Sequence, residues 1–202
     1  MTTDELMRLA PVIPVLVLEE EVDWAALAET FVAAGLPVLE ITLRTPVALD
    51  AIRQMSRVPG AVVGAGTVLN ELQLAQAIDA GSTFIVSPGL TNPLALAARE
   101  TEIALLPGVA TAGDIMRGLD LGLDRFKFFP AEASGGIAAL KALSAPFAQV
   151  RFCPTGGIRP DTAPDWLALP SVLCVGGTWF VKPGDGLDAI AERARAAAAL
   201  AR

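Results

Sequence analysis

The chain has 202 residues, 53% of them hydrophobic, and a formal net charge of −7. This much apolar side chain supports a sizeable core and excludes a disordered chain. The acidic balance opposes attraction to nucleic acid, whose phosphates require clustered Lys and Arg, so we expect no nucleic-acid partner. Apolar runs are far shorter than the roughly twenty residues of a membrane span. Met1–Ala10 carries Asp4 and Glu5 and does not resemble a secretory signal. We therefore expect no membrane contact and a cytoplasmic protein.

The absence of two residue types narrows the chemistry. The sequence contains no His and no Tyr, so the commonest general base and the commonest metal ligand are missing. Its two cysteines, Cys153 and Cys174, lie in apolar segments without the spacing of a zinc site or a disulfide framework. We expect buried thiols, no metal and no cofactor, with proton transfer left to Asp, Glu or Lys.

Along the chain, short β-branched runs alternate with segments of helical period, a pattern typical of parallel strands covered by helices. The predicted strands are Val12–Leu18, Val38–Leu43, Ala61–Ala65, Thr83–Ser87, Ile103–Leu106, Arg125–Phe129, Arg151–Pro154 and Val172–Val175. The predicted helices include Trp24–Ala34, Glu71–Ala80 and Leu187–Leu200, with Asn70 and Thr111 as N-caps and Gly81 as a helix stop.

Eight strand–helix pairs predict an α/β fold, a single-domain (β/α)8 TIM barrel over residues 1–202. An open doubly wound sheet is the competing architecture, because periodicity alone does not separate the two. Polar residues and glycines gather where the predicted strands end, which is where a barrel places its active site. This distribution favours the barrel.

Lys127 lies in the apolar stretch Phe126-Lys127-Phe128-Phe129-Pro130, an unusual place for a cation. Burial disfavours the charged form, and a neutral amine is a nucleophile that can form a Schiff base with a ketone. The alternative is a lysine that reaches the strand end or pairs with a carboxylate such as Glu40, without covalent chemistry. Strand alternation places Lys127 on the opposite face from Phe126 and Phe128, which predicts an inward lysine.

The second unusual charge is Glu40, which shares one strand face with Thr42 and Arg44. In a half-exposed strand this face would be solvated, whereas in a barrel it points inward. An inward carboxylate beside an amine can move the protons of carbinolamine formation and carbon–carbon cleavage, so Glu40 is the candidate acid and base. Arg44, nearer the rim, can hold a substrate carboxylate with two hydrogen bonds.

Two glycine pairs follow the last two predicted strands, Gly156-Gly157 and Gly176-Gly177. Glycine lets backbone N–H groups surround an anion, and barrels often bind phosphate at these two loops. The alternative is ordinary tight-turn geometry. Gly64-Ala65-Gly66-Thr67 lacks the third glycine and the acidic residue of a dinucleotide fingerprint, so a nicotinamide site is rejected.

Several motifs together resemble the family of 2-dehydro-3-deoxy-6-phosphogluconate aldolase, also called 4-hydroxy-2-oxoglutarate aldolase. They are the segments Glu40–Thr45, Val63–Leu69, Ser87–Leu90, Phe126–Glu132 and Arg151–Gly157. The resemblance implies a metal-free homotrimeric barrel that cleaves the phosphorylated 2-oxo sugar acid into pyruvate and glyceraldehyde 3-phosphate in the Entner–Doudoroff route. It also implies cleavage of 4-hydroxy-2-oxoglutarate into pyruvate and glyoxylate.

Matched motif by motif, Lys127 resembles the Schiff-base lysine of this family and Glu40 its catalytic carboxylate. Other matches imply substrate contacts at Arg44, Thr67, Pro88, Phe129 and Thr155, and a phosphate site at Gly156, Gly157 and Thr178. The loop pattern described above adds Gly176 and Gly177 to the predicted phosphate site. Thr178 stands where a serine is expected, although its hydroxyl can also donate a hydrogen bond. The segment after Trp179 is shorter than in the family. This difference affects the structure of the rim and the affinity for phosphate, and it leaves the chemistry unchanged.

Two alternatives stay open. The aldolase for 2-dehydro-3-deoxy-6-phosphogalactonate would use the same lysine and carboxylate, although Leu43-Arg44-Thr45 and Phe128–Glu132 favour the gluconate type. A noncatalytic phosphate-ligand-binding barrel is the alternative from another class. The joint presence of Lys127, Glu40 and Arg44 speaks against it, because a binding module needs no desolvated amine.

Overall fold

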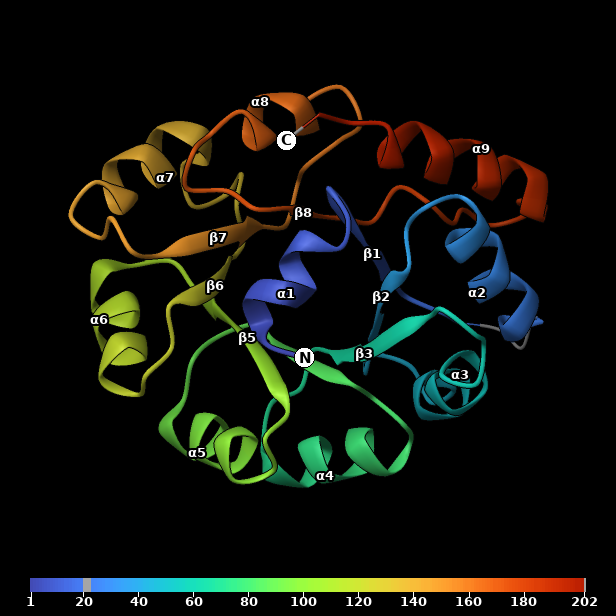
Figure 1. Ribbon diagram of the computed structural model, residues 1–202, viewed down its shortest axis with the longest axis horizontal. Coiled ribbons are helices and arrows are strands. Elements are labelled where there is room, and N and C mark those ends of the chain that lie inside the picture. Colours follow the sequence, from blue (N-terminus) through green and yellow to red (C-terminus); the bar gives the residue numbers. More distant parts are fainter. Residues whose placement is uncertain (20–22, 202) are drawn as a thin grey trace.

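The computed structural model describes residues 1–19 and 23–201, and within them eight parallel strands form a nearly closed barrel surrounded by helices (Figure 1). The strand order is β7-β6-β5-β4-β3-β2-β1-β8. Single bridges from Phe152 to Val172 and from Thr155 to Gly176 connect the two outer strands of this order. The predicted barrel is therefore confirmed.

The strands are β1 Val12–Leu16, β2 Val38–Thr42, β3 Val62–Gly66, β4 Phe84–Ser87, β5 Ala104–Val109, β6 Arg125–Phe128, β7 Arg151–Pro154 and β8 Val175–Gly177. The helices are α1 Thr3–Arg8, α2 Trp24–Ala33, α3 Ala48–Met55, α4 Glu71–Asp79, α5 Asn92–Glu100, α6 Ala112–Asp120, α7 Gly136–Ser144, α8 Ala163–Leu167 and α9 Leu187–Ala198. Across the described ranges, no helix is both long enough and apolar enough to span a membrane.

The predicted helix ends agree with the structure. Asn70 accepts a hydrogen bond from the Gln73 N–H at the start of α4, and Thr111 caps α6 through the Asp114 N–H. Gly81 follows α4 with φ of +100°, a conformation that favours glycine and ends the helix.

The last predicted strand was wrong in its position. Val172–Val175 was expected, but Val172 makes only a single bridge and β8 covers Val175–Gly177. Gly176 and Gly177 pair with Ile13 and Pro14 of β1. Glycine has a poor intrinsic preference for strands, so this extension depends on the neighbouring strand and not on local sequence.

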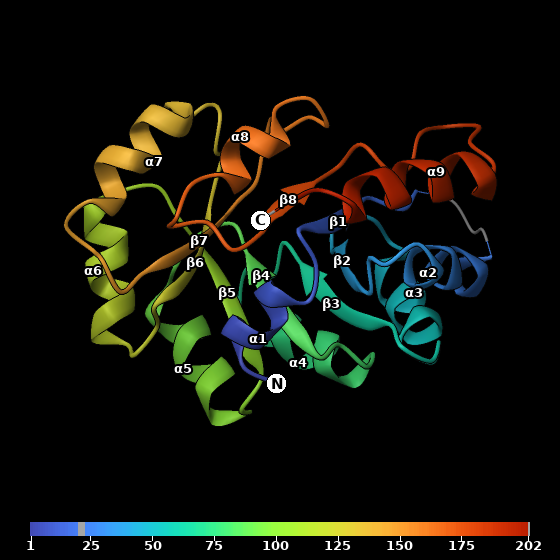
Figure 2. The same ribbon diagram turned by 45° about the horizontal axis from the view of Figure 1, so that its top comes forward.

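Helix α1 lies across the end of the barrel where the strands begin (Figure 2). Its Leu6 and Met7 are fully buried and pack with Ile13 and Phe84 inside the barrel. The Thr3 hydroxyl donates to the Leu105 carbonyl at 3.2 Å. This helix therefore fills one end of the barrel and leaves the opposite rim for the site.

Two hydrophobic clusters separate the inside of the barrel from its outside. The larger cluster lies between strands and helices and contains Phe126 and Phe128. The smaller one fills the barrel below the site and contains Cys153 and Cys174, which are both buried free thiols. Because Phe126 and Phe128 face outward, Lys127 between them faces inward, as the strand alternation predicted.

Candidate active site

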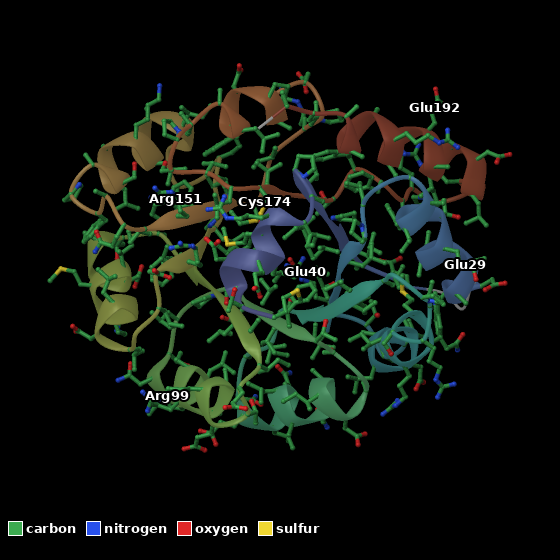
Figure 3. All side chains as sticks on the ribbon, viewed as in Figure 1. Glu29, Glu40, Arg99, Arg151, Cys174 and Glu192 are labelled. Atoms are coloured by element: carbon green, nitrogen blue, oxygen red, sulfur yellow. The ribbon has the colours of Figure 1, made fainter. Side chains whose placement is uncertain are left out.

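Lys127 and Glu40 meet inside the barrel although their strands lie on opposite sides of it. Lys127 belongs to β6 and Glu40 to β2, which stand four places apart in the strand order. Lys127 Nζ lies 3.1 Å from Glu40 Oε1 and 3.4 Å from Oε2. Their side chains are only 7% and 4% exposed. In Figure 3, Glu40 lies near the centre of the molecule, whereas Glu29 and Glu192 lie on the outer helices.

The surroundings of this pair are largely apolar. The Phe129 ring centroid lies 5.3 Å from Lys127 Nζ, a favourable distance for a cation–π contact. Because water is mostly excluded, the contact between Lys127 and Glu40 must itself offset the cost of removing both charges from water. A proton can pass directly from the Lys127 ammonium to the Glu40 carboxylate without a bridging water. The transfer yields a neutral amine beside a carboxylic acid. The pair can therefore supply both a nucleophile and its proton acceptor.

Glycine on β3 makes room for the carboxylate. A Cβ built on Gly66 would lie 2.7 Å from Glu40 Cγ and 2.8 Å from Cδ, distances that real Cβ atoms do not show. Two residues earlier, a Cβ on Gly64 would lie 2.5 Å from the Phe84 ring. This role of Gly66 was not predicted from the sequence, where the segment served as a rejected nucleotide motif and as part of the family resemblance. Alternation of glycines on one strand face was the available signal.

Arg44 and Thr67 lie side by side at the rim. Arg44 follows β2, is exposed, and donates from Nε to Thr67 Oγ1 at 3.1 Å. Thr67 has φ of +60°, a strained conformation for a β-branched residue, and such strain often marks a functional position. Thr42, predicted to share the face of Glu40, is buried and donates to the Leu16 carbonyl at 3.2 Å. In the part of the chain that the structure describes, the polar partner of the Arg44 side chain is therefore the Thr67 hydroxyl.

The turn after β7 presents backbone N–H groups. Gly156 and Gly157 have φ of +102° and +83°, which only glycine adopts without strain. The single bridge between Thr155 and Gly176 directs the Gly156 N–H toward the Gly176 carbonyl, whereas within residues 1–19 and 23–201 no hydrogen-bond acceptor is found for the Gly157 N–H. The exposed Gly157 N–H is therefore available to donate to an anion.

The β8 glycines differ from this turn. Gly176 and Gly177 are buried, and each makes room for a side chain: Thr155 Cγ2 lies 2.8 Å from a Cβ on Gly176, and Trp179 Cε3 lies 2.7 Å from one on Gly177. These glycines therefore shape the site by packing. Thr178, the next residue, is exposed at the rim.

The remaining predicted positions follow strand ends at the same rim. Pro88 comes after β4 and Phe129 after β6, both partly buried, and Thr155 is buried after β7. Glu132, at the end of the Phe126–Glu132 segment, contacts the glycine turn and accepts a hydrogen bond from Trp166 Nε1 at 3.3 Å. Among the described residues, no group of three or more Cys, Asp or Glu side chains is placed to hold a metal ion.

Comparisons with known proteins agree with this geometry. Residues 3–192 match the family model described as KDPG and KHG aldolase. A 2-dehydro-3-deoxy-phosphogluconate aldolase of Zymomonas mobilis is 63% identical over 181 residues, which cover 90% of this chain and 87% of that protein.

Two solved structures have the same fold. The 2-keto-3-deoxy-6-phosphogluconate aldolase of Zymomonas mobilis ZM4 with 3-phosphoglycerate superposes with a TM-score of 0.97 at 59% identity, covering 99% of this chain and 96% of that one. The KDPG aldolase of Legionella pneumophila, with pyruvate captured as a covalent carbinolamine intermediate, gives a TM-score of 0.93 at 43% identity, covering 98% and 99%. The chain belongs to the KDPG and KHG aldolase family.

Proposed function

We propose that the protein is a class I aldolase that cleaves 2-dehydro-3-deoxy-6-phosphogluconate into pyruvate and glyceraldehyde 3-phosphate. Lys127 is the Schiff-base nucleophile and Glu40 the proton-transfer group. The observation that carries this proposal is the buried contact of 3.1 Å between Lys127 Nζ and Glu40 Oε1. Family membership supports the reaction class.

The chemistry follows from this pair. Glu40 takes a proton from Lys127, and the neutral amine attacks the C2 carbonyl of the substrate to give a carbinolamine. Protonation of its hydroxyl by Glu40 releases water and forms the Schiff base. The Glu40 carboxylate then accepts the C4 hydroxyl proton while the C3–C4 bond breaks, and the electron pair moves into an enamine. Protonation at C3 and hydrolysis return pyruvate and the free lysine.

The rim residues orient the two ends of the substrate. Arg44 and Thr67 bind the carboxylate, because the guanidinium offers a fork of donors next to a hydroxyl. Pro88, Phe129 and Thr155 form the walls around C2. At the other end, the glycine turn at Gly156 and Gly157 and the hydroxyl of Thr178 bind the phosphate, beside Gly176, which leaves room for the Thr155 side chain.

Trapping with pyruvate and borohydride tests the covalent step. Reduction should add one adduct per chain, seen by intact mass, and peptide mapping should place it on Lys127. The other two lysines, Lys141 and Lys182, are exposed and act as internal controls. Labelling of either control, or full aldolase activity without any labelling, would overturn the mechanism.

Substrate comparison tests the specificity. Cleavage of 4-hydroxy-2-oxoglutarate should occur with the same lysine but a lower kcat/KM, because this substrate has no phosphate to bind the glycine turn. Gly157→Val should reduce kcat/KM for the phosphorylated substrate much more than for the unphosphorylated one. The C4 epimer, 2-dehydro-3-deoxy-6-phosphogalactonate, should be cleaved more slowly. A preference for that epimer would assign the chain to the galactonate reaction.

We also propose a homotrimer, each chain folding as one domain, in the cytoplasm. The charged sugar acid crosses a bilayer poorly, so the enzyme is expected where its substrate is made. Exposed apolar side chains on the outer helices, Leu72 on α4 (68% exposed) and Met116 on α6 (58%), are consistent with contacts between copies. Sedimentation equilibrium should give three times the chain mass, and a monomer would reject the trimer.

A further inference from the structure

The glycine turn after β7 is held from outside by the segment after β6. The Ala131 N–H donates to the Thr155 carbonyl at 2.8 Å, and the Glu132 N–H donates to the Gly156 carbonyl at 3.0 Å. These two hydrogen bonds fix the two peptide planes that carry the N–H groups of Gly156 and Gly157. The backbone of the turn is thus tied to the strand that carries Lys127.

The side chain of Glu132 lies across this turn. Its Cγ and Cβ lie 2.6 Å and 2.7 Å from the position of a Cβ on Gly157, so the aliphatic part of Glu132 covers that residue. Beyond the turn, Glu132 Oε1 accepts a hydrogen bond from Trp166 Nε1 at 3.3 Å. Trp166 is fully buried in α8, and its ring lies 6.3 Å from that of Phe128 on β6. Glu132 therefore connects the turn to a rigid part of the core.

A carboxylate beside a phosphate site requires an explanation, because two anions repel each other. Glu132 brings no favourable charge to a phosphate, and its acceptor oxygen is directed to the Trp166 ring nitrogen instead. The Trp166 N–H would otherwise be buried without a partner, which costs free energy. The geometry is that of a support for the turn and not of a ligand for the phosphate.

We infer that Glu132 and Trp166 are positioning residues that hold the glycine turn, and with it the N–H group of Gly157, in the orientation that binds the substrate phosphate. The pair thereby sets the preference of the enzyme for phosphorylated over unphosphorylated 2-oxo acids. This inference rests on the proposed function and deepens it, because it assigns specificity to residues that touch neither Lys127 nor the substrate carboxylate.

Three variants separate support from charge. Glu132→Ala removes both the cover over Gly157 and the acceptor for Trp166. Trp166→Phe keeps an aromatic ring but removes the N–H donor. Glu132→Gln keeps the stem and the acceptor and removes the charge. For each variant, kcat/KM is measured for 2-dehydro-3-deoxy-6-phosphogluconate and for 4-hydroxy-2-oxoglutarate, together with competitive inhibition by inorganic phosphate.

We expect Glu132→Ala to lower the ratio of the two kcat/KM values about tenfold and to weaken phosphate inhibition by a similar factor, since a displaced N–H loses a charge-assisted hydrogen bond. Trp166→Phe should lower the ratio about threefold, and the double variant should lose no more than Glu132→Ala alone, because the residues act as one unit. Glu132→Gln should restore the ratio to within about twofold of the wild-type value.

Equal losses on both substrates, or no loss in Glu132→Ala, would overturn the inference. A Glu132→Gln variant as impaired as Glu132→Ala would overturn it as well, because charge and not support would then matter. If the wild-type enzyme showed no preference for the phosphorylated substrate, the proposed phosphate site itself would fail. The wild-type measurement alone therefore distinguishes a failure of the proposed phosphate site from a failure of the positioning role of Glu132 and Trp166.

Discussion

Gly66→Ala is the smallest change that should disable the site. Gly66 is not among the residues with positive φ, so alanine fits its backbone. The added methyl group, however, would lie 2.7 Å from Glu40 Cγ, where carbon atoms normally keep about 3.5–4.0 Å apart. Glu40 must therefore move by about 1 Å, which lengthens its contact of 3.1 Å with Lys127.

The expected magnitudes follow from this shift. A displacement of about 1 Å at a reacting group can cost on the order of 100-fold in rate. Overpacking a core lowers the free energy of unfolding by about 1–3 kcal/mol. Replacing glycine by alanine raises it by about 0.4–1 kcal/mol, because the unfolded chain has less conformational entropy. The net loss of unfolding free energy is then roughly 0–2.6 kcal/mol. The variant should therefore fold but turn over about 100-fold more slowly.

Gly64→Ala is the matched control, because it adds the same methyl group on the same strand but against the Phe84 ring. Both variants are compared by kcat for the phosphorylated substrate and by urea unfolding. Gly64→Ala should lose comparable stability and retain most of its turnover. Normal turnover in Gly66→Ala, or equal losses of turnover in both variants at equal stability, would refute the argument that Gly66 positions Glu40.

Three further predictions concern the proton carrier, metals and pH. Glu40→Gln should lower kcat about 10²–10⁴-fold, since no histidine can take over proton transfer, and near-normal turnover would move the base elsewhere. Incubation with a chelator should leave aldolase activity intact, and a loss that a divalent cation restores would indicate a metal-dependent mechanism. Hydrogen bonds from Arg8 and Arg125 lower the pKa of Asp4 below its ordinary 3.8, so Asp4 stabilises the fold at neutral pH and this contribution is lost as pH falls through the lowered value. Asp4→Asn should therefore reduce unfolding free energy at pH 7 by at most about 1 kcal/mol, because Asp4 is one-third exposed, and a difference that grew on acidification would contradict this sign.

The barrel could be predicted from the sequence because its strands and helices carry strong local signals. Seven of the eight predicted strands overlap their observed counterparts closely, for example Arg151–Pro154, which matches β7 at both ends. The inward direction of Lys127 followed from the outward direction of Phe126 and Phe128. Alternation along one strand was sufficient for that inference, because successive side chains of a barrel strand point either to the inside or to the outside of the barrel.

Other features depend on contacts between distant segments. The start of α1 has a capping box at Thr2, but nothing local indicates that Leu6 and Met7 fill the barrel end. The fit of Gly66 to Glu40 involves residues on two strands, and the bond from Trp166 to Glu132 joins positions 34 residues apart. Such contacts are set by the tertiary fold, so a single sequence carries little information about them.

The ion pair of Lys127 and Glu40 joins two interpretations that the sequence left as alternatives. One was a lysine paired with a carboxylate, and the other was a reactive amine. A buried ion pair gives little net stability over a well-packed apolar pair, because desolvation offsets the attraction. The surrounding core is apolar and could accommodate such a replacement in energetic terms. A pair maintained at this cost is explained by its chemistry: the carboxylate that contacts Lys127 is also the acceptor for the proton that the amine must lose before it can attack a carbonyl.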